Sequence, residues 1–161
     1  MSVYVLQARS GKEQEACRRL RRMGYDAFIP MKTMQLRSGG TWFEKTLPIF
    51  TQYIFIRFEP SPEDYHLIRS VEGVVRFLGN SKPEPISTAE EAYMMWLWNE
   101  GKPLGVSKVF ISAQGEKMIL SGPLRKYQGS EIEYRLRQRR AAVYITLCGK
   151  KRKLILPVVA V

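Results

Sequence analysis

The side chains best suited to chemistry in this sequence are basic, and they gather in three short groups near the C-terminus. Guanidinium and ammonium groups at such spacing bind phosphates, and arginine offers a fork of donors that fits phosphate oxygens. We therefore expect a nucleic-acid-binding surface built from all three groups. They are Arg125 and Lys126; Arg135, Arg137, Arg139 and Arg140; and Lys150, Lys151, Arg152 and Lys153.

Catalytic chemistry is not expected from the remaining polar residues. His66 is the only histidine, and no nucleophile, metal-ligand cluster or glycine-rich phosphate loop is spaced to work with it. The acidic pairs Glu63-Asp64 and Glu90-Glu91 are neighbours in sequence, so their side chains do not converge on one substrate. Cys17 and Cys148 lie far apart and are each expected to be a small buried residue. The sequence therefore predicts no enzyme, no metal and no cofactor.

The distribution of charge along the 161 residues narrows the class of partner. Residues 1–101 hold 13 Lys/Arg against 12 Asp/Glu, whereas residues 102–161 hold 13 against 3. The second part therefore carries +10 of the formal net charge of +11, and such a field attracts polyanions. No apolar run reaches the roughly 18–20 residues of a membrane span, and the N-terminus lacks a signal-peptide pattern. We expect a protein of the cytosol.

A change of composition at residues 101–107, where Pro103 and Gly105 fall, indicates a domain boundary. We predict an N-terminal domain at 1–101, a linker at 102–108 and a C-terminal domain at 109–161. In the first domain, the apolar spacing predicts helices and strands in alternation. These are a strand at 3–8, a helix at 13–23, a hairpin with a long tip near Gly39-Gly40, a strand at 53–58, a short helix at 65–69, a strand at 74–78 and a helix at 88–99.

Two local patterns refine this outline. Ser87 and Glu90 have the spacing of a capping box, which begins the last of these helices. Beyond residue 108, short segments of alternating residues at 117–121, 130–136, 142–148 and 154–161 predict strands. Turn residues separate them at Gly122-Pro123, at 137–140 and at 149–151. Short strands joined by such turns predict a small β-barrel.

The strand at 53–58 has two contrasting sets of side chains. Alternation places Ile54, Ile56 and Phe58 on one side, which we expect to face the core. Tyr53, Phe55 and Arg57 lie on the other side, where aromatic residues followed by a charge are typical of a partly exposed recognition face. A strand covered on both sides would have a similar pattern.

Five groups of residues along the chain together form a recognisable pattern. They are Tyr4-Val5-Leu6 with Gly11-Lys12-Glu13, Phe28-Ile29-Pro30, Leu47-Pro48-Ile49-Phe50-Thr51-Gln52-Tyr53-Ile54-Phe55, Gly73-Val74-Val75-Arg76-Phe77-Leu78-Gly79 and Gly122-Pro123-Leu124. In their order and spacing, rather than in any one of them, the chain resembles the NusG family of transcription elongation factors over essentially its whole length.

The resemblance implies an α+β fold. An N-terminal α/β sandwich with an antiparallel sheet would be followed by an SH3-like five-stranded barrel, the KOW domain. It also implies that the N-terminal domain binds the clamp helices of RNA polymerase and opposes pausing, so that the protein shifts an equilibrium of the polymerase. Aromatic side chains are typical interface anchors. Carried over to this sequence, the polymerase-binding patch would consist of Ile49, Phe50, Tyr53 and Phe55.

Three departures from the family pattern indicate a specialised paralogue similar to RfaH and LoaP. Thr51-Gln52 replaces the family's Pro-Gly, Val3 replaces its opening tryptophan, and Lys126 replaces a KOW glycine, with Gly129 arriving later. The basic second part favours nucleic acid over a protein partner for the barrel. Few aromatic residues lie among these charges, which favours a folded RNA over a single strand, because single-strand binders usually offer stacking platforms.

We therefore predict a monomeric antitermination factor that binds RNA polymerase and an RNA hairpin in the nascent transcript, away from membranes. Upstream duplex DNA stays open as the nucleic acid, because the sequence alone does not separate it from RNA. Two alternatives also stay open. One is a general elongation factor whose barrel contacts protein or DNA nonspecifically. The other is an RNA-binding KOW protein that acts at the ribosome.

Overall fold

The protein is described by a computed structural model at residues 2–79, 82–127, 129 and 131–161. It divides into two compact units whose segments do not follow the order of the chain. The first unit comprises Met1–Ile29, Phe50–Ala92 and Leu147–Lys150, and the second Pro30–Ile49, Tyr93–Thr146 and Lys151–Val161. Antiparallel sheets with helices and a curled C-terminal sheet confirm the predicted α+β class. The chain-order boundary at 102–108 stays a prediction.

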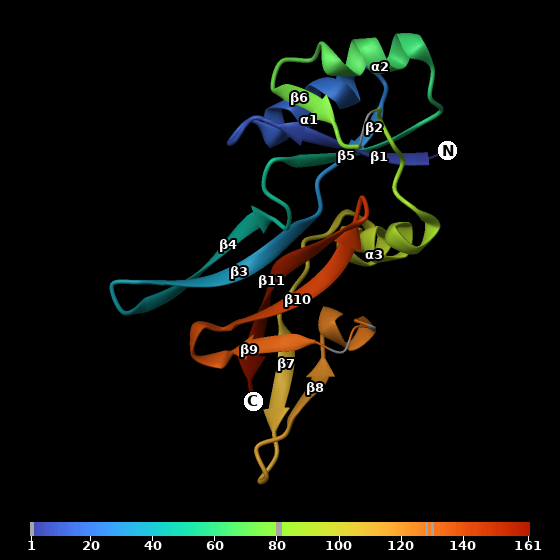
Figure 1. Ribbon diagram of the computed structural model, residues 1–161. Coiled ribbons are helices and arrows are strands. Elements are labelled where there is room, and N and C mark those ends of the chain that lie inside the picture. Colours follow the sequence, from blue (N-terminus) through green and yellow to red (C-terminus); the bar gives the residue numbers. More distant parts are fainter. Residues whose placement is uncertain (1, 80–81, 128, 130) are drawn as a thin grey trace. The chain divides into compact units, whose positions relative to one another are not determined.

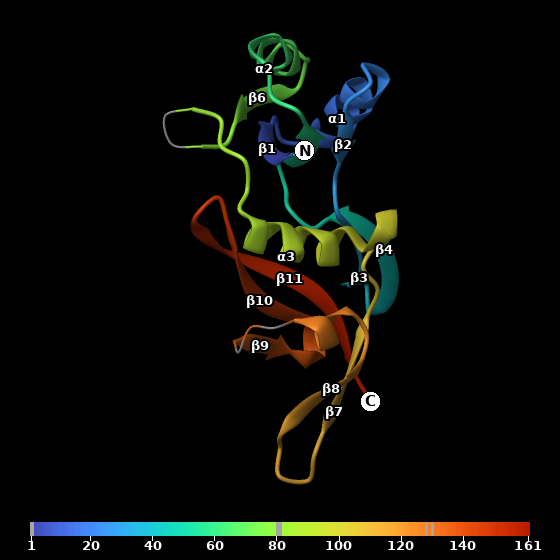
Figure 2. The ribbon, with the colours of Figure 1, turned by 90° about the vertical axis from the view of Figure 1, so that its right-hand side faces the viewer.

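The first unit is built on a four-stranded sheet in the order β2-β5-β1-β6. Its strands are β1 (Ser2–Ala8), β2 (Asp26–Phe28), β5 (Tyr53–Phe58) and β6 (Val74–Phe77). Strand β1 pairs antiparallel with both β5 and β6. Helix α1 (Glu13–Arg22) packs against β2 and β5, and helix α2 (Pro62–Arg69) packs against β6, as Figure 1 and Figure 2 show.

Helical and strand periodicity placed the core of this unit correctly. Ala16, Cys17 and Leu20 form the buried stripe of α1. In β5 the side chains of Ile54, Ile56 and Phe58 are buried, as alternation predicted. The ring of Tyr4 on β1 lies 5.0 Å from that of Phe58, in a cluster that continues to α2.

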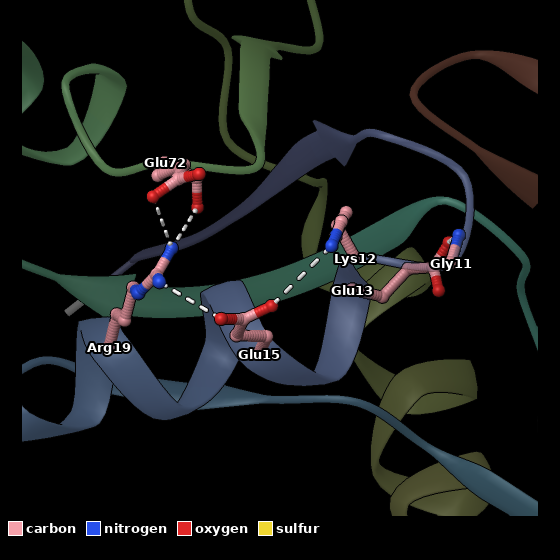
Figure 3. A network of polar contacts seen from close by, with 6 residues as sticks. All are labelled: Gly11, Lys12, Glu13, Glu15, Arg19 and Glu72. Atoms are coloured by element: carbon pink, nitrogen blue, oxygen red, sulfur yellow. Dashed lines mark hydrogen bonds and ion pairs between the residues drawn. The ribbon is translucent and has the colours of Figure 1, made fainter.

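Part of the polar surface of α1 is paired within the unit (Figure 3). Arg19 bridges two carboxylates, that of Glu15 at 2.9 Å and that of Glu72 at 3.1 Å. Lys12 lies 3.8 Å from Glu15, and the backbone N–H of Gly11 donates to Glu13. These pairs are consistent with the nearly balanced charge of residues 1–101.

The second unit contains a hairpin and a five-stranded sheet. The hairpin joins β3 (Met31–Ser38) to β4 (Thr41–Pro48). The sheet has the order β8-β7-β11-β10-β9, in which the neighbouring strands β7 and β11 pair in parallel. This sheet is the predicted barrel. Its elements are β7 (Ser107–Ile111), β8 (Lys117–Ser121), η2 (Pro123–Lys126), β9 (Ile132–Arg135), η3 (Leu136–Gln138), β10 (Arg140–Leu147) and β11 (Lys150–Ala160).

Helix α3 (Thr88–Trp98) begins with the predicted capping box and continues into the short η1 (Asn99–Gly101). The N–H of Ser87 donates to the Glu90 carboxylate at 3.1 Å, and the N–H of Glu90 donates to the Ser87 hydroxyl at 3.2 Å. The same carboxylate accepts the N–H groups of Cys148 and Gly149 at 3.2 Å each. Glu90 thus caps the helix and also holds the turn between β10 and β11.

Several predicted boundaries are wrong in informative ways. The β3–β4 tip is a two-residue turn at Gly39-Gly40, with φ of 58° and 80°, instead of a long one. The last turn lies at Cys148-Gly149, so Lys150 already belongs to β11 and the predicted turn at 149–151 is shifted. Strand β7 was not predicted and begins inside the predicted linker. Ser130, the predicted start of the strand at 130–136, lies outside the described residues.

Candidate nucleic-acid interface

The arginine group at 135–140 surrounds the connection from β9 to β10. Arg135 ends β9, Arg137 lies in η3, and Arg135 and Arg140 are register partners across the two strands. The side chains of Arg135 and Arg137 are exposed. Within the described part of the chain, neither has a carboxylate within 4.0 Å. These two guanidinium groups are therefore available to phosphates.

Arg139, in the same connection, is held by the β3–β4 hairpin. Its guanidinium carbon lies 4.0 Å from the centre of the Trp42 ring, and its Nη1 donates to the Gln35 side chain. Its backbone is left-handed, with φ of 55°, which costs a non-glycine residue about 1 kcal/mol. Cation–π contact and a charge-assisted hydrogen bond are each worth about as much, so they can offset that cost. No pattern in the sequence indicates that Trp42 belongs to this surface.

Arg140 and Lys32 bring two positive charges into the interior of the second unit. Lys32 is buried on β3, and its Nζ donates to the carbonyl of Ile155 at 2.6 Å. Burial, and then the charge of Arg140, lower the pKa of Lys32 to about 8. The Nε of Arg140 is buried with no hydrogen-bond partner among the described residues. Arg140 is therefore less suited to bind a phosphate than its exposed neighbours are.

The lysines of the 150–153 group are compensated by acidic residues. Lys151 lies 3.3 Å from Glu131 and Lys153 lies 3.6 Å from Glu133. The Tyr144 hydroxyl donates to Glu133 at 2.9 Å, and this bond, followed by the charge of Lys153, holds the pKa of Glu133 below its usual range. Of the remaining two residues, Lys150 is exposed and Arg152 is half-buried. The sequence predicts that this group binds phosphates, but in the structure Glu131 and Glu133 neutralise part of its positive charge.

The group at Arg125 and Lys126 lies on η2, next to a tight contact with β7. Both side chains are exposed, and Arg125 donates to the carbonyl of Leu120 at 3.2 Å. The Ser107 hydroxyl accepts the N–H of Leu124 at 3.0 Å and fixes the start of this short helix. The group is rigidly placed on the barrel surface.

The aromatic residues predicted to contact a protein partner form a cluster in the first unit. The ring of Phe50 lies 6.2 Å from that of Tyr53 and 5.5 Å from that of Phe55. Phe55 also stacks on Phe28, at 5.8 Å. Phe50 and Phe55 are buried, whereas Tyr53 is half-buried; Ile49, in the second unit, is buried as well.

The expectation that Phe55 lies on a partly exposed face is wrong. Its side chain is fully buried because β5 is covered on both faces, which is the alternative reading of the strand pattern. Tyr53 is the member of the cluster nearest to solvent. It follows a turn in which Gln52 has a left-handed φ of 68°, at the position where the family resemblance places a glycine.

Two further observations concern sites of other kinds. The described residues contain no group of three or more His, Cys, Asp or Glu side chains that could hold a metal ion. None of the helices in the described ranges is both long and apolar enough to cross a membrane.

Comparison with known proteins gives one family. The model of the family described as "Transcription termination factor nusG" matches residues 1–95. Transcription termination/antitermination protein NusG of Helicobacter pylori strain J99 is 24% identical over 93% of this chain and 91% of its own. The NusG proteins of Pasteurella multocida and Haemophilus influenzae are 25% and 27% identical, each over 91% of this chain and over 86% and 85% of their own.

A solved structure has the same fold. NusG of Thermotoga maritima superimposes with a TM-score of 0.61 over 97% of this chain and 93% of its own, at 21% sequence identity. The predicted resemblance is thus confirmed both by sequence and by fold. With the family match covering more than half of its residues, the chain belongs to the NusG family of transcription termination and antitermination factors.

Proposed function

We propose that this NusG-family factor binds RNA polymerase and a structured RNA of the nascent transcript, and that it promotes processive elongation and antitermination as a monomer. The polymerase contact lies within residues 1–101, and the RNA contact within the domain at 109–161. The observation that carries the RNA contact is the pair Arg135 and Arg137 beside Arg139: both side chains are exposed, and neither has a carboxylate within 4.0 Å among the described residues.

A folded RNA suits this surface better than a single strand does. A-form RNA is recognised through its shape and phosphates, for which arginine's forked donors are well suited. The aromatic residues of the barrel are largely engaged elsewhere. Tyr127 stacks on Trp96, and Tyr144 bonds to Glu133. The barrel itself therefore offers few free rings on which successive bases could stack.

Two double variants of equal charge change test the RNA contact. Arg135→Gln/Arg137→Gln removes two exposed charges that have no carboxylate within 4.0 Å among the described residues, and Lys151→Gln/Lys153→Gln removes two that are paired with glutamates. We expect the arginine variant to weaken binding to an RNA hairpin about ten-fold or more, and to lower the slope of log affinity against log salt by about two. The lysine variant should change both quantities much less, because Glu131 and Glu133 already offset those charges.

The measurement is a titration of the full chain and both variants against a library of RNA hairpins, matched single strands and duplex DNA at two salt concentrations. Selective hairpin binding that persists at the higher salt supports the proposal. Equal and steeply salt-dependent binding to all three nucleic acids would contradict it and would favour a general elongation factor. Equal losses for the two variants would overturn the assignment to Arg135 and Arg137.

We place the polymerase contact at Tyr53. Its ring packs against Phe50, which in turn packs against the buried Phe55. Aromatic side chains bury a large area at low entropic cost, and Tyr53 is the half-exposed member of the cluster. Tyr53→Ala should reduce binding to bacterial core RNA polymerase about ten-fold or more, as expected for an interface anchor. It should also remove the effect on pausing in single-round transcription.

Tyr53→Phe is the matched control, because it keeps the ring and should retain most of the binding. RNA affinity should be the same for wild type and both Tyr53 variants. If Tyr53→Ala transcribes like the wild type, the contact lies elsewhere. A chain that binds ribosomes and has no affinity for polymerase would support the ribosomal alternative.

A further inference from the structure

The ring of Trp42 continues the arginine surface onto the β3–β4 hairpin. Trp42 and Arg37 are register partners across that hairpin, and the Arg37 guanidinium carbon lies 5.6 Å from the centre of the indole. Arg139 approaches the same ring to 4.0 Å. Two guanidinium groups, from a strand and from the η3 connection, thus gather at one half-exposed indole within the second unit.

The backbone register fixes which side chains share this face. Gln35 and Arg37 are two residues apart on β3, so they lie on the same face of the hairpin. Their register partners on β4, Glu44 and Trp42, lie on that face too. Phe43 belongs to the other face of the hairpin, although it is 45% exposed. Glu44 is the acidic member of the Trp42 face. It has no cation within 4.0 Å among the described residues.

Arg139 is positioned as part of a rigid platform. The Gln35 side chain accepts a bond from its guanidinium, and its backbone carbonyl accepts the N–H of Val158 at 3.1 Å. Guanidinium and indole are both flat groups on which a nucleobase can stack, and a nearby cation strengthens such stacking. Phosphates next to the stacked base would meet Arg37 and the exposed Arg137.

We propose that Trp42, with Arg37 and Arg139, forms a subsite for an unpaired base of the bound RNA. The inference rests on the proposed RNA function and adds to it the ligand's chemistry: a hairpin whose loop or bulge presents an unstacked nucleotide. The arginines of the barrel contact the phosphates of the RNA stem, and Trp42 of the β3–β4 hairpin stacks on the unpaired base. The subsite thus adds an indole to the few free rings that the barrel offers.

Two RNA probes separate base stacking from charge. One is a hairpin with an unpaired loop that carries 2-aminopurine, and the other is a fully paired duplex RNA of the same stem. We expect Trp42→Ala in the full chain to weaken binding of the looped probe about ten-fold, to leave the duplex affinity nearly unchanged and to keep the salt slope. Wild type should quench the 2-aminopurine on binding, and the variant should not.

Matched variants keep the test clear of folding effects. Trp42→Phe retains a ring and should keep most of the affinity and quenching, whereas Phe43→Ala alters an exposed ring on the other face and should change neither. Glu44→Gln should tighten binding of both probes, because it removes a carboxylate beside the subsite. Thermal melts of all variants report any loss of fold.

The outcomes distinguish the subsite from the proposed function. If wild type binds neither probe, the RNA function itself fails and the subsite fails with it. If wild type binds both probes and Trp42→Ala weakens them equally, Trp42 only positions Arg139, and the base subsite is overturned. An unchanged looped-probe affinity in Trp42→Ala, with wild type bound, overturns the subsite while the RNA function stands.

Discussion

Lys32 places an ammonium group in a largely buried position. The side chain is 9% exposed, and its one described hydrogen-bond acceptor is the carbonyl of Ile155. No carboxylate lies within 4.0 Å of it in the described ranges, and the nearby Arg140 adds a second positive charge. Burying a charge without a counter-charge costs free energy, so protonated Lys32 lowers the stability of the fold. The size of this penalty depends on pH, because the lysine can lose its proton.

This penalty predicts an unusual dependence of stability on pH. The folded pKa of Lys32 is about 8, against an ordinary value of 10.5. Between these values the unfolded chain keeps a proton that the folded chain has released, so stability rises with pH, by up to about 3 kcal/mol. Lys32→Met should abolish this rise and should be more stable than wild type at pH 7 by about 1–2 kcal/mol.

Urea unfolding at pH 7, 8, 9 and 10 measures the effect, and Lys45→Met on the neighbouring strand is the control for an exposed lysine. The pKa values of Tyr4 and Tyr25 are raised to about 12, mainly by burial. Above pH 10 they reduce stability in every variant alike, so they cancel in the difference. Parallel curves for wild type and Lys32→Met would show that the folded lysine titrates normally.

Alternation of side chains predicted the core better than it predicted the surface. The burial of Ile54, Ile56 and Phe58 follows from strand period alone. The burial of Phe55 does not, because a strand covered on one face and a strand covered on two can have the same sequence. The role of Trp42 depends on Arg139, nearly a hundred residues away, and no local pattern carries that information.

Among the elements, the start of η2 depends on the closeness of Gly122 to β7. Its φ is 98°, and a Cβ there would lie 2.5 Å from the Ser107 Cα and 2.7 Å from the Val106 carbonyl oxygen. Backbone cannot move aside as the end of a flexible side chain can. The glycine therefore permits both the turn and the buried bond from Leu124 to the Ser107 hydroxyl.

Gly122→Ala should destabilise the protein by about 3 kcal/mol or more, as left-handed strain and a backbone clash add. Gly149→Ala is the matched control. Its φ is 75°, but a Cβ there meets nothing within 4 Å, so strain alone should cost about 1 kcal/mol. Equilibrium denaturation of both variants measures the difference. Equal costs would mean that the η2 turn shifts to accommodate the methyl group.

Turn chemistry explains which element boundaries could be predicted. Gly39-Gly40 and Gly122-Pro123 are recognisable because glycine and proline mark turns. The turn at Cys148-Gly149 begins with a cysteine at a φ of 52°, which sequence does not predict, so the strand that follows was placed too late. The Glu90 carboxylate accepts hydrogen bonds from two backbone N–H groups of that turn, and this long-range contact fixes the position of the turn.

At the scale of the whole molecule, the distribution of charge predicts a polyanionic partner but does not locate its binding site. The excess of positive charge beyond residue 101 is a property of composition. How much of this charge is available to bind a polyanion depends on ion pairs within the fold, because Glu131 and Glu133 offset Lys151 and Lys153. Composition counts these lysines and Arg135 alike, whereas in the described part of the chain the fold brings no carboxylate within 4.0 Å of Arg135 or Arg137.

The parallel pairing of β11 with β7 has a consequence for how the chain is made. Val158, Val159 and Ala160 pair with Ser107, Lys108 and Val109, about fifty residues earlier. Sheets that join distant segments fold slowly, because a long loop must close before any contact is gained. The segment that completes the sheet leaves the ribosome about fifty residues after β7 does. The barrel should therefore close only after β11 has left the ribosome, whereas the β3–β4 hairpin and the sheet of the first unit can already have formed.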